Sequence, residues 1–217
     1  MMKSLRVKSD PGLRRYTSLA SVLDLLQTGR ITLLSPARWD DGNDSWFMSE
    51  YGRLTRAKTV LAVCFAQTSE TYHHWRVFSP GPDGVCVEFN KSPLVESLEG
   101  QTGVIQGEVQ YATIPALRRR AAVAASDLPF LKRKPYEPEC EYRVVYFDLN
   151  KVMEAKDFQI DLGWIKRITL SPWMPDALKA SVRKTLKSIP HCQDLSVVRS
   201  SLIGNDEWKK QAVRARA

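Results

Sequence analysis

The chain has 217 residues, of which 43% are hydrophobic and 26% are charged, and its formal net charge is +8 with a pI of about 9.4. This length supports one sizeable hydrophobic core or at most two small ones, and the composition is that of an ordinary globular protein. No apolar run approaches the roughly 20 residues that a membrane helix needs, and residues 1–8 lack the apolar segment of an export signal. We therefore predict a cytoplasmic protein without a membrane partner.

The first 55 residues predict two strands, each followed by a helix. A run at 13–16 and an apolar run at 31–34 have the length of short strands. After the first run, apolar residues recur at helical spacing up to Leu26, between an N-cap at Thr17 or Ser18 and a C-cap at Gly29. After the second run, a polar turn at 40–44 leads into a helix that carries the aromatic residues Trp46, Phe47 and Tyr51 and continues to Leu54.

The rest of the chain predicts mainly strands. They lie at 60–65, 84–89, 104–111, 139–147, 158–162, 165–170 and 195–199. Helices are predicted at 115–126 and at 176–188, the second burying Leu178, Val182 and Leu186. Because this order lacks strict βαβ alternation, we predict a single α+β domain over 13–204, with a curved, mainly antiparallel sheet flanked by helices. An N-terminal extension (1–12) precedes it, and a polar, basic, frayed tail (205–217) follows it.

The cysteines and histidines give no metal-site pattern. The four cysteines are Cys64, Cys86, Cys140 and Cys192, and none belongs to a CxxC pair. Three of them fall in strand-like runs, where a thiol packs as a small apolar group. With only three histidines in the chain, we predict reduced thiols and no metal.

The strand that begins near Glu139 carries the most informative charge pattern. On a strand, Glu139, Glu141 and Arg143 share one face. Two like charges on one side of a buried strand cost free energy unless a cation or a ligand lies between them. One interpretation is a solvated strand end at which Arg143 neutralises Glu141. The other is a ligand-binding or catalytic face on a rigid strand, and the residues alone leave both open.

Other polar and aromatic residues also allow two interpretations. Glu88 lies in an apolar strand, where exposure at the strand end is the usual explanation and a face shared with the Glu139–Glu141 pair is the alternative. Asn43 and Asp44 suit a turn, because their side chains bond to nearby backbone. Trp75 is a core aromatic residue or a ligand contact. Basic residues cluster at 118–120, 132–134, 179–187 and 209–216, and such clusters either bind phosphates or form solvated helix faces.

Several motifs resemble one known family over roughly Leu13 to Ile203. They are Leu13-Arg14-Arg15-Tyr16, Gly29-Arg30-Ile31-Thr32-Leu33-Leu34-Ser35-Pro36, Asn43-Asp44, Trp75-x-x-Phe78, Gly84-Val85-Cys86-Val87-Glu88-Phe89 and Glu139-Cys140-Glu141-Tyr142-Arg143-Val144. In these motifs the chain resembles the prokaryotic domain-of-unknown-function family 2971. It departs from that family at Ser45 and at Ala66, where proline and serine are usual. The resemblance implies no activity, because the family itself has none assigned.

A second resemblance is to ADP-ribosyltransferases. These enzymes have an Arg or His on the first strand, a glycine-led short strand after the first helix, and a late Glu-x-Glu pair. Here Arg15, residues 29–35 and the pair Glu139 and Glu141 take those places, while no Ser-Thr-Ser triplet is present. The resemblance implies that Glu141 stabilises the oxocarbenium-like ribose formed when the nicotinamide bond of NAD breaks, and that Glu139 faces the acceptor.

The resemblance also implies a set of residues that hold NAD. They are Arg15, Tyr16, Trp75 and Arg143. The function expected from it is that of a NAD-utilising transferase acting on a protein or nucleic-acid acceptor, as a toxin or phage-defence effector. The alternative is a non-catalytic module that binds a nucleotide or nucleic acid. A third interpretation is an interaction domain in which the charged residues form only a salt-bridge cluster.

Overall fold

The computed structural model describes residues 12–214, and within that range the chain folds into two compact units. Unit 1 comprises residues 12–14, 31–68 and 89–160, and unit 2 comprises residues 15–30, 69–88 and 161–214. Because each unit is assembled from three separate segments, no single cut in the chain separates them. The predicted single domain over 13–204 therefore stays a prediction. The predicted extension at 1–12 lies, apart from Gly12, outside the described residues.

Unit 1 is built on an antiparallel sheet. Its strands are β2 (Arg30–Leu34), β3 (Thr59–Ala66), β5 (Val104–Glu108), β8 (Glu141–Asp148) and β9 (Ala155–Gln159). β8 pairs with β3 on one side and with β5 on the other, and β3 also pairs with β2, all antiparallel. β9 lies beyond β2. A separate parallel pair is formed by β6 (Gln110–Ala112) and β7 (Leu131–Arg133).

Several helices complete unit 1. They are α2 (Gly42–Thr55), α4 (Lys91–Leu98), α5 (Ile114–Arg118) and 3-10 helices at Pro36–Arg38, Ala125–Phe130 and Lys134–Glu139. Met48 of α2 packs on Ala62 of β3 and Val145 of β8 in the core. β3 and β8 are both buried over most of their length; β3 is a nearly continuous apolar run, whereas β8 opens with the charged residues Glu141 and Arg143.

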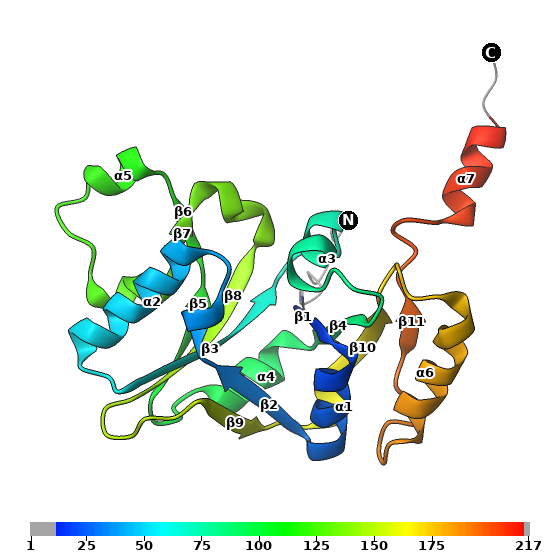
Figure 1. The fold of residues 1–217 in the computed structure, drawn as a ribbon, viewed down its shortest axis with the longest axis horizontal. Coiled ribbons are helices and arrows are strands. Elements are labelled where there is room, and N and C mark those ends of the chain that lie inside the picture. Colours follow the sequence, from blue (N-terminus) through cyan, green and yellow to red (C-terminus); the bar gives the residue numbers. More distant parts are fainter. Residues whose placement is uncertain (1–11, 215–217) are drawn as a thin grey trace, which may run out of the picture. The chain divides into compact units, whose positions relative to one another are not determined.

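The strands of unit 2 lie in the order β11-β10-β4-β1. The strands are β1 (Leu13–Ser18), β4 (Gly84–Phe89), β10 (Ile165–Leu170) and β11 (Val197–Arg199), of which the last two are parallel. Its helices are α1 (Leu19–Thr28), α3 (Tyr72–Phe78), α6 (Asp176–Ser188), α7 (Asp206–Val213) and a 3-10 helix at Leu162–Trp164. All strands and α-helices are labelled in Figure 1, where α6 lies beside β11.

The α+β class and the mainly antiparallel pairing predicted from the sequence are confirmed. The caps of α1 are also confirmed. Ser18 accepts a hydrogen bond from the Ser21 N–H, and Gly29 ends the helix at a φ of 63°, a left-handed conformation that glycine adopts without strain. None of the described helices has the length and apolar character needed to cross a membrane.

Four local predictions are wrong. The strand predicted at 104–111 is divided into β5 and β6. The helix predicted at 115–126 is limited to α5, because this segment has no buried face to stabilise a longer helix. Helix α6 has the predicted bounds, but of its three expected core residues only Leu186 is buried, and Leu178 is 53% exposed. The tail at 205–217, expected to be frayed, contains α7.

Candidate functional site

Five charged side chains meet inside unit 1, and none of these side chains is more than 8% exposed. They are Asp44 of α2, Lys132 of β7, Glu139 at the end of a 3-10 helix, and Glu141 and Arg143 of β8. We call this group the charge cluster. It contains three carboxylates and two cations, so it carries one surplus negative charge. A buried arrangement of this kind requires close pairing, since an unpaired buried charge costs several kcal/mol.

Arg143 is the centre of the charge cluster and is fully buried. Its Nη1 and Nη2 groups donate to the two carboxylate oxygens of Asp44 at 2.7 and 2.5 Å. Its Nε and Nη2 groups donate to the two oxygens of Glu141 at 2.6 and 3.0 Å. Nη1 also donates to the Pro129 carbonyl at 3.0 Å. All five N–H groups of the guanidinium thus have an acceptor.

Lys132 links all three carboxylates of the charge cluster. Its Nζ lies 2.6 Å from Glu139 Oε2, 3.3 Å from Glu141 Oε2 and 3.4 Å from Asp44 Oδ2. Burial alone lowers the pKa of Lys132, but the negative charges of Glu141 and Glu139 outweigh it and raise that pKa. The ammonium group takes the position between carboxylates that a metal ion would need. Within residues 12–214, no group of three or more His, Cys, Asp or Glu side chains is placed to hold a metal.

Neighbouring groups fix the ionisation of Glu141. Burial alone raises the pKa of this carboxyl, but the adjacent Arg143 and Lys132 charges lower it to about 2. The Cys64 thiol also donates to Glu141, while burial and that negative charge raise the pKa of Cys64 well above its usual value. The Glu141 backbone N–H donates to the Tyr111 hydroxyl at 2.9 Å. Cys64 is therefore a neutral thiol at physiological pH and lacks the thiolate character of a nucleophile.

The predicted catalytic pair lies in this closed environment. Both Glu139 and Glu141 are at least 95% buried, and both oxygens of Glu141 accept hydrogen bonds from Arg143. This is the geometry of carboxylates that join elements of the fold. The predicted solvated strand end is therefore wrong, whereas the predicted neutralisation of Glu141 by Arg143 is confirmed. The catalytic role of the pair stays a prediction, because a substrate would have to replace contacts that already exist.

The six predicted site residues fall into two groups. Glu139, Glu141 and Arg143 come together in unit 1, whereas Arg15, Tyr16 and Trp75 belong to unit 2. The predicted single cleft that contains both groups stays a prediction.

Two residues of the unit 2 group, Tyr16 and Trp75, contact each other in an aromatic core. The Trp75 ring is completely buried, contacts the Tyr16 ring edge-on at 5.1 Å, and donates from Nε1 to Glu70 at 2.9 Å. The other face of Tyr16 is stacked on His74, with ring centroids 5.4 Å apart. These contacts make Trp75 a core residue of unit 2 rather than an exposed stacking surface.

The sequence interpretation missed two members of the charge cluster, Asp44 and Lys132. Asp44 was assigned to a turn, but Asp41 is the N-cap of α2, so Asp44 lies inside the first helical turn and faces the buried cluster. The spacing of these two acidic residues, which is that of a capping box, was the available signal. Lys132 was placed in a basic cluster that either binds phosphates or is solvated, although a buried Glu139–Glu141 pair needs a second cation besides Arg143.

The structure corrects two further expectations, which concern the first residue of β8 and the burial of Glu88. β8 begins at Glu141 and not at Glu139, because Cys140 has a left-handed conformation with a φ of 45° that interrupts the alternation. Glu139 still reaches the charge cluster through Lys132. Glu88, expected to be exposed, is buried in unit 2, where Arg167 donates to it at 2.7 Å. Its charge is compensated by residues from the neighbouring strand β10.

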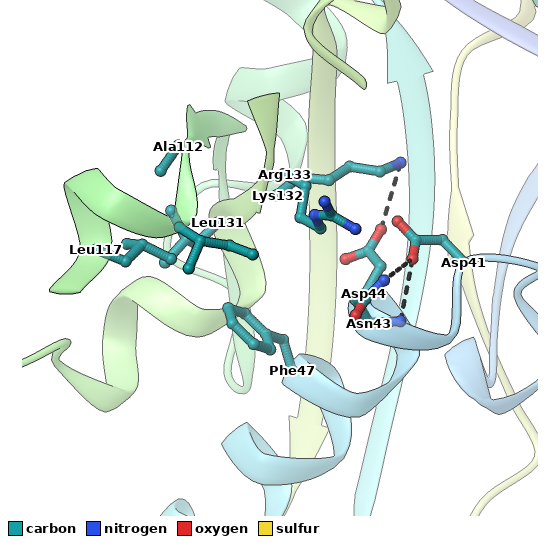
Figure 2. A pocket seen from close by; sticks show the side chains of 10 residues that line it. Asp41, Asn43, Asp44, Phe47, Ala112, Leu117, Leu131, Lys132 and Arg133 are labelled. Atoms are coloured by element: carbon teal, nitrogen blue, oxygen red, sulfur yellow. Dashed lines mark hydrogen bonds and ion pairs between the residues drawn. The ribbon is translucent and has the colours of Figure 1, made fainter. Parts of the chain in front are cut away.

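A small cavity of about 30 Å³ lies beside the charge cluster. Figure 2 shows Phe47, Leu117 and Leu131 on one side of it, and Asp41, Asn43 and Asp44 on the other. Since one water molecule needs roughly 10–15 Å³ on this measure, the cavity has room for about two waters. It is too small to hold a nucleotide.

A larger open groove of about 590 Å³ is lined by α2 and by residues of the neighbouring segments 35–37 and 57–60. Its size is within the range of small-molecule sites, roughly 300–1,000 Å³. Trp46, which is 63% exposed, lines it together with Arg53 and Lys58. The hydroxyl side chains that line it are Ser35, Ser45 and Ser49. We call this feature the α2 groove.

In comparisons with known proteins, no family model and no curated protein matches this chain. The resemblances to the domain-of-unknown-function family 2971 and to ADP-ribosyltransferases stay predictions, and function has to be inferred from the geometry of the site.

Proposed function

We propose that unit 1 is a non-catalytic module that binds a nucleotide unit, free or within a nucleic acid strand, in the α2 groove. The observation that carries this proposal is the exposed Trp46 ring in a groove that also contains Arg53 and Lys58. An indole ring beside cations is the combination that binds nucleic-acid bases and phosphates without base-specific contacts, by stacking and charge.

Each side chain of the groove has a suitable role in such a complex. The Trp46 ring stacks on a base, which is worth about 1–3 kcal/mol per base. Lys58 has no ion-pair partner among the described residues and is available to a phosphate, while Arg53 already contacts Glu50 at 2.8 Å and is partly neutralised. The serine hydroxyls are donors and acceptors for ribose or phosphate oxygens.

The charge cluster supports this function by fixing the helix that lines the groove. Asp44 and Trp46 are two residues apart, so they point to nearly opposite sides of α2. Asp44 faces inward and is held by Arg143 of β8, while Trp46 faces the groove. A helix that is fixed by a buried ion pair presents its outer side chains in one defined position, which reduces the entropy lost on binding.

The proposal is tested by calorimetric titration of ATP, NAD and a short single-stranded RNA into the purified protein. Trp46→Ala is expected to weaken binding roughly 5- to 150-fold, corresponding to the loss of one stacking contact. Trp208→Ala is the matched control, because Trp208 is 80% exposed and belongs to unit 2. Equal affinities of the wild type and the Trp46→Ala variant, or no binding of any of the three ligands, would refute the proposal.

A second candidate function is the NAD-utilising transferase, and the surplus negative charge of the cluster favours it. Cleavage of the nicotinamide–ribose bond develops positive charge on the sugar, which a fixed carboxylate stabilises. Asp44 and Lys132 line the small cavity beside the cluster, and because this cavity is too small for a nucleotide, a bound NAD has to displace existing contacts of the cluster. Release of nicotinamide from NAD, measured with protein, RNA and DNA acceptors, is the test. No release under any of these conditions excludes this candidate.

A further inference from the structure

We infer that unit 2 binds the phosphodiester backbone of a nucleic acid through a row of cations on α6. This binding is distinct from the function proposed for unit 1. The surface belongs to the other unit, and it suits a chain of phosphates rather than a single nucleotide. It consists of Lys179, Arg183, Lys184 and Lys187, which line one shallow depression of about 470 Å³. We call it the α6 row.

The spacing of the α6 row follows from helix geometry. Lys179, Arg183 and Lys187 are four residues apart, so they lie on one face at intervals of about 6 Å. Lys184 lies next to them and lines the same depression. Like charges at this spacing destabilise a helix slightly, so the row has a cost in the unbound protein. An anionic ligand with several charges along its length removes that repulsion.

The charges of the α6 row are not compensated within the described part of the chain. None of its four side chains has an ion pair or hydrogen bond with a described residue. The one acidic residue in the depression is Asp176, and Arg199 contacts it at 3.1 Å. The local field is therefore that of about four positive charges, which attracts a polyanion.

The composition of α6 favours nucleic acid over a membrane surface. A helix that lies in a membrane interface needs a broad exposed apolar face with Trp, Phe or Leu. In α6, Leu186 is buried against the unit and Leu178 is the large apolar residue that is exposed. Long cationic side chains without such a face match a phosphodiester backbone, which offers repeated charges and little apolar surface.

The inference is tested by the salt dependence of binding to a labelled single-stranded RNA of about 20 nucleotides, followed by fluorescence anisotropy. The test variant is Lys179→Ala/Arg183→Ala/Lys187→Ala, in which alanine preserves helix propensity. The matched control is Arg118→Ala/Arg119→Ala/Arg120→Ala in unit 1, which removes the same charge from three exposed side chains. Circular dichroism verifies that both variants keep their helix content, and a glutamine version of the α6 variant replaces the alanine version if it does not.

The α6 variant is expected to reduce the slope of log K against log salt by about 2, since each lost phosphate contact on a single strand accounts for about 0.7. At about 0.1 M salt its affinity falls 10- to 100-fold, while the control variant stays within a few-fold of the wild type. An equal loss in both variants, an unchanged slope, or preferred binding of phosphatidylserine vesicles or an acidic peptide would overturn the inference. ATP affinity is measured in parallel for the wild type and for Trp46→Ala, so that failure of the α2 groove to bind a nucleotide is distinguished from failure of the α6 row to bind RNA.

Discussion

Asp44 and Arg143 are 99 residues apart in the chain, yet both carboxylate oxygens of Asp44 accept hydrogen bonds from Arg143, at 2.7 and 2.5 Å. The pair joins the first turn of α2 to the central strand β8. Both side chains are buried, so the contact is protected from water and from salt screening. Together with the packing of Met48 in the core, it holds α2, which lines the α2 groove.

Asp44→Asn is expected to lower the free energy of unfolding by about 3–5 kcal/mol, because it leaves part of the buried Arg143 charge without a partner. Urea unfolding at pH 7 measures this loss. Asp41→Asn is the control, since asparagine is an equally good N-cap and the cost should be within about 0.5 kcal/mol. Similar stabilities of the two variants would show that the buried pair does not fix α2.

Lys132→Met should destabilise the protein at pH 7, because three carboxylates then remain with one cation. Lys132 is one of the charges that lower the pKa of Glu141, so in the variant that pKa moves back towards its ordinary value of 4.5, and the variant recovers part of its deficit relative to the wild type as the pH falls from 4.5 towards 2. Unfolding curves at several pH values give the measurement. Arg133→Met, at the neighbouring exposed position, should change stability by less than about 0.5 kcal/mol and show no such recovery.

The lowered pKa of Glu141 predicts a defined part of the acid sensitivity of the wild type. In the folded protein this pKa is about 2, against an ordinary value of 4.5, so the unfolded chain takes up the proton first. The stability contributed by Glu141 is thus complete above pH 4.5 and is lost between pH 4.5 and 2. It amounts to about 3 kcal/mol. Glu141→Gln should be less stable at pH 7 and should lack this part of the pH dependence, and parallel curves for the two proteins would contradict the assignment.

Trp75→Ala should cost about 3–5 kcal/mol, because it leaves a large cavity next to Tyr16 in unit 2. Trp208→Ala changes the same residue type at an exposed position and should be nearly neutral. Thermal unfolding followed by calorimetry compares the two. A small effect of Trp75→Ala would favour the earlier interpretation of this residue as a ligand contact.

Local signals in the sequence predict the features that depend on a few neighbouring residues. Ser18 and Gly29 mark the ends of α1, because caps act within one helical turn. The bounds of α6 follow from a repeat of apolar residues, and the strands β3 and β4 from short apolar runs. Burial was less predictable: the same apolar repeat places Leu178 and Leu186 on one side of α6, but the unit covers only Leu186.

Only part of the charge cluster could be predicted from the sequence. The sequence identified Glu139, Glu141 and Arg143 as an unusual group, because their spacing on one strand is a local property. It did not identify Asp44 and Lys132 as their partners, since these come from α2 and β7 and meet β8 only when the sheet and helices have packed.

By itself, then, the sequence determined the α+β class, the main helices and strands, and the segment around Glu141 as the place where charge is concentrated. Only the tertiary structure decided that this charge is buried and paired, that Trp75 belongs to a core while Trp46 lines an open groove, and that the cations of α6 have no described partner. The physical reason is that these interactions act over different distances along the chain. Backbone propensity and side-chain periodicity act over one or two turns, whereas burial and ion pairing depend on residues that are brought together from distant parts of the chain.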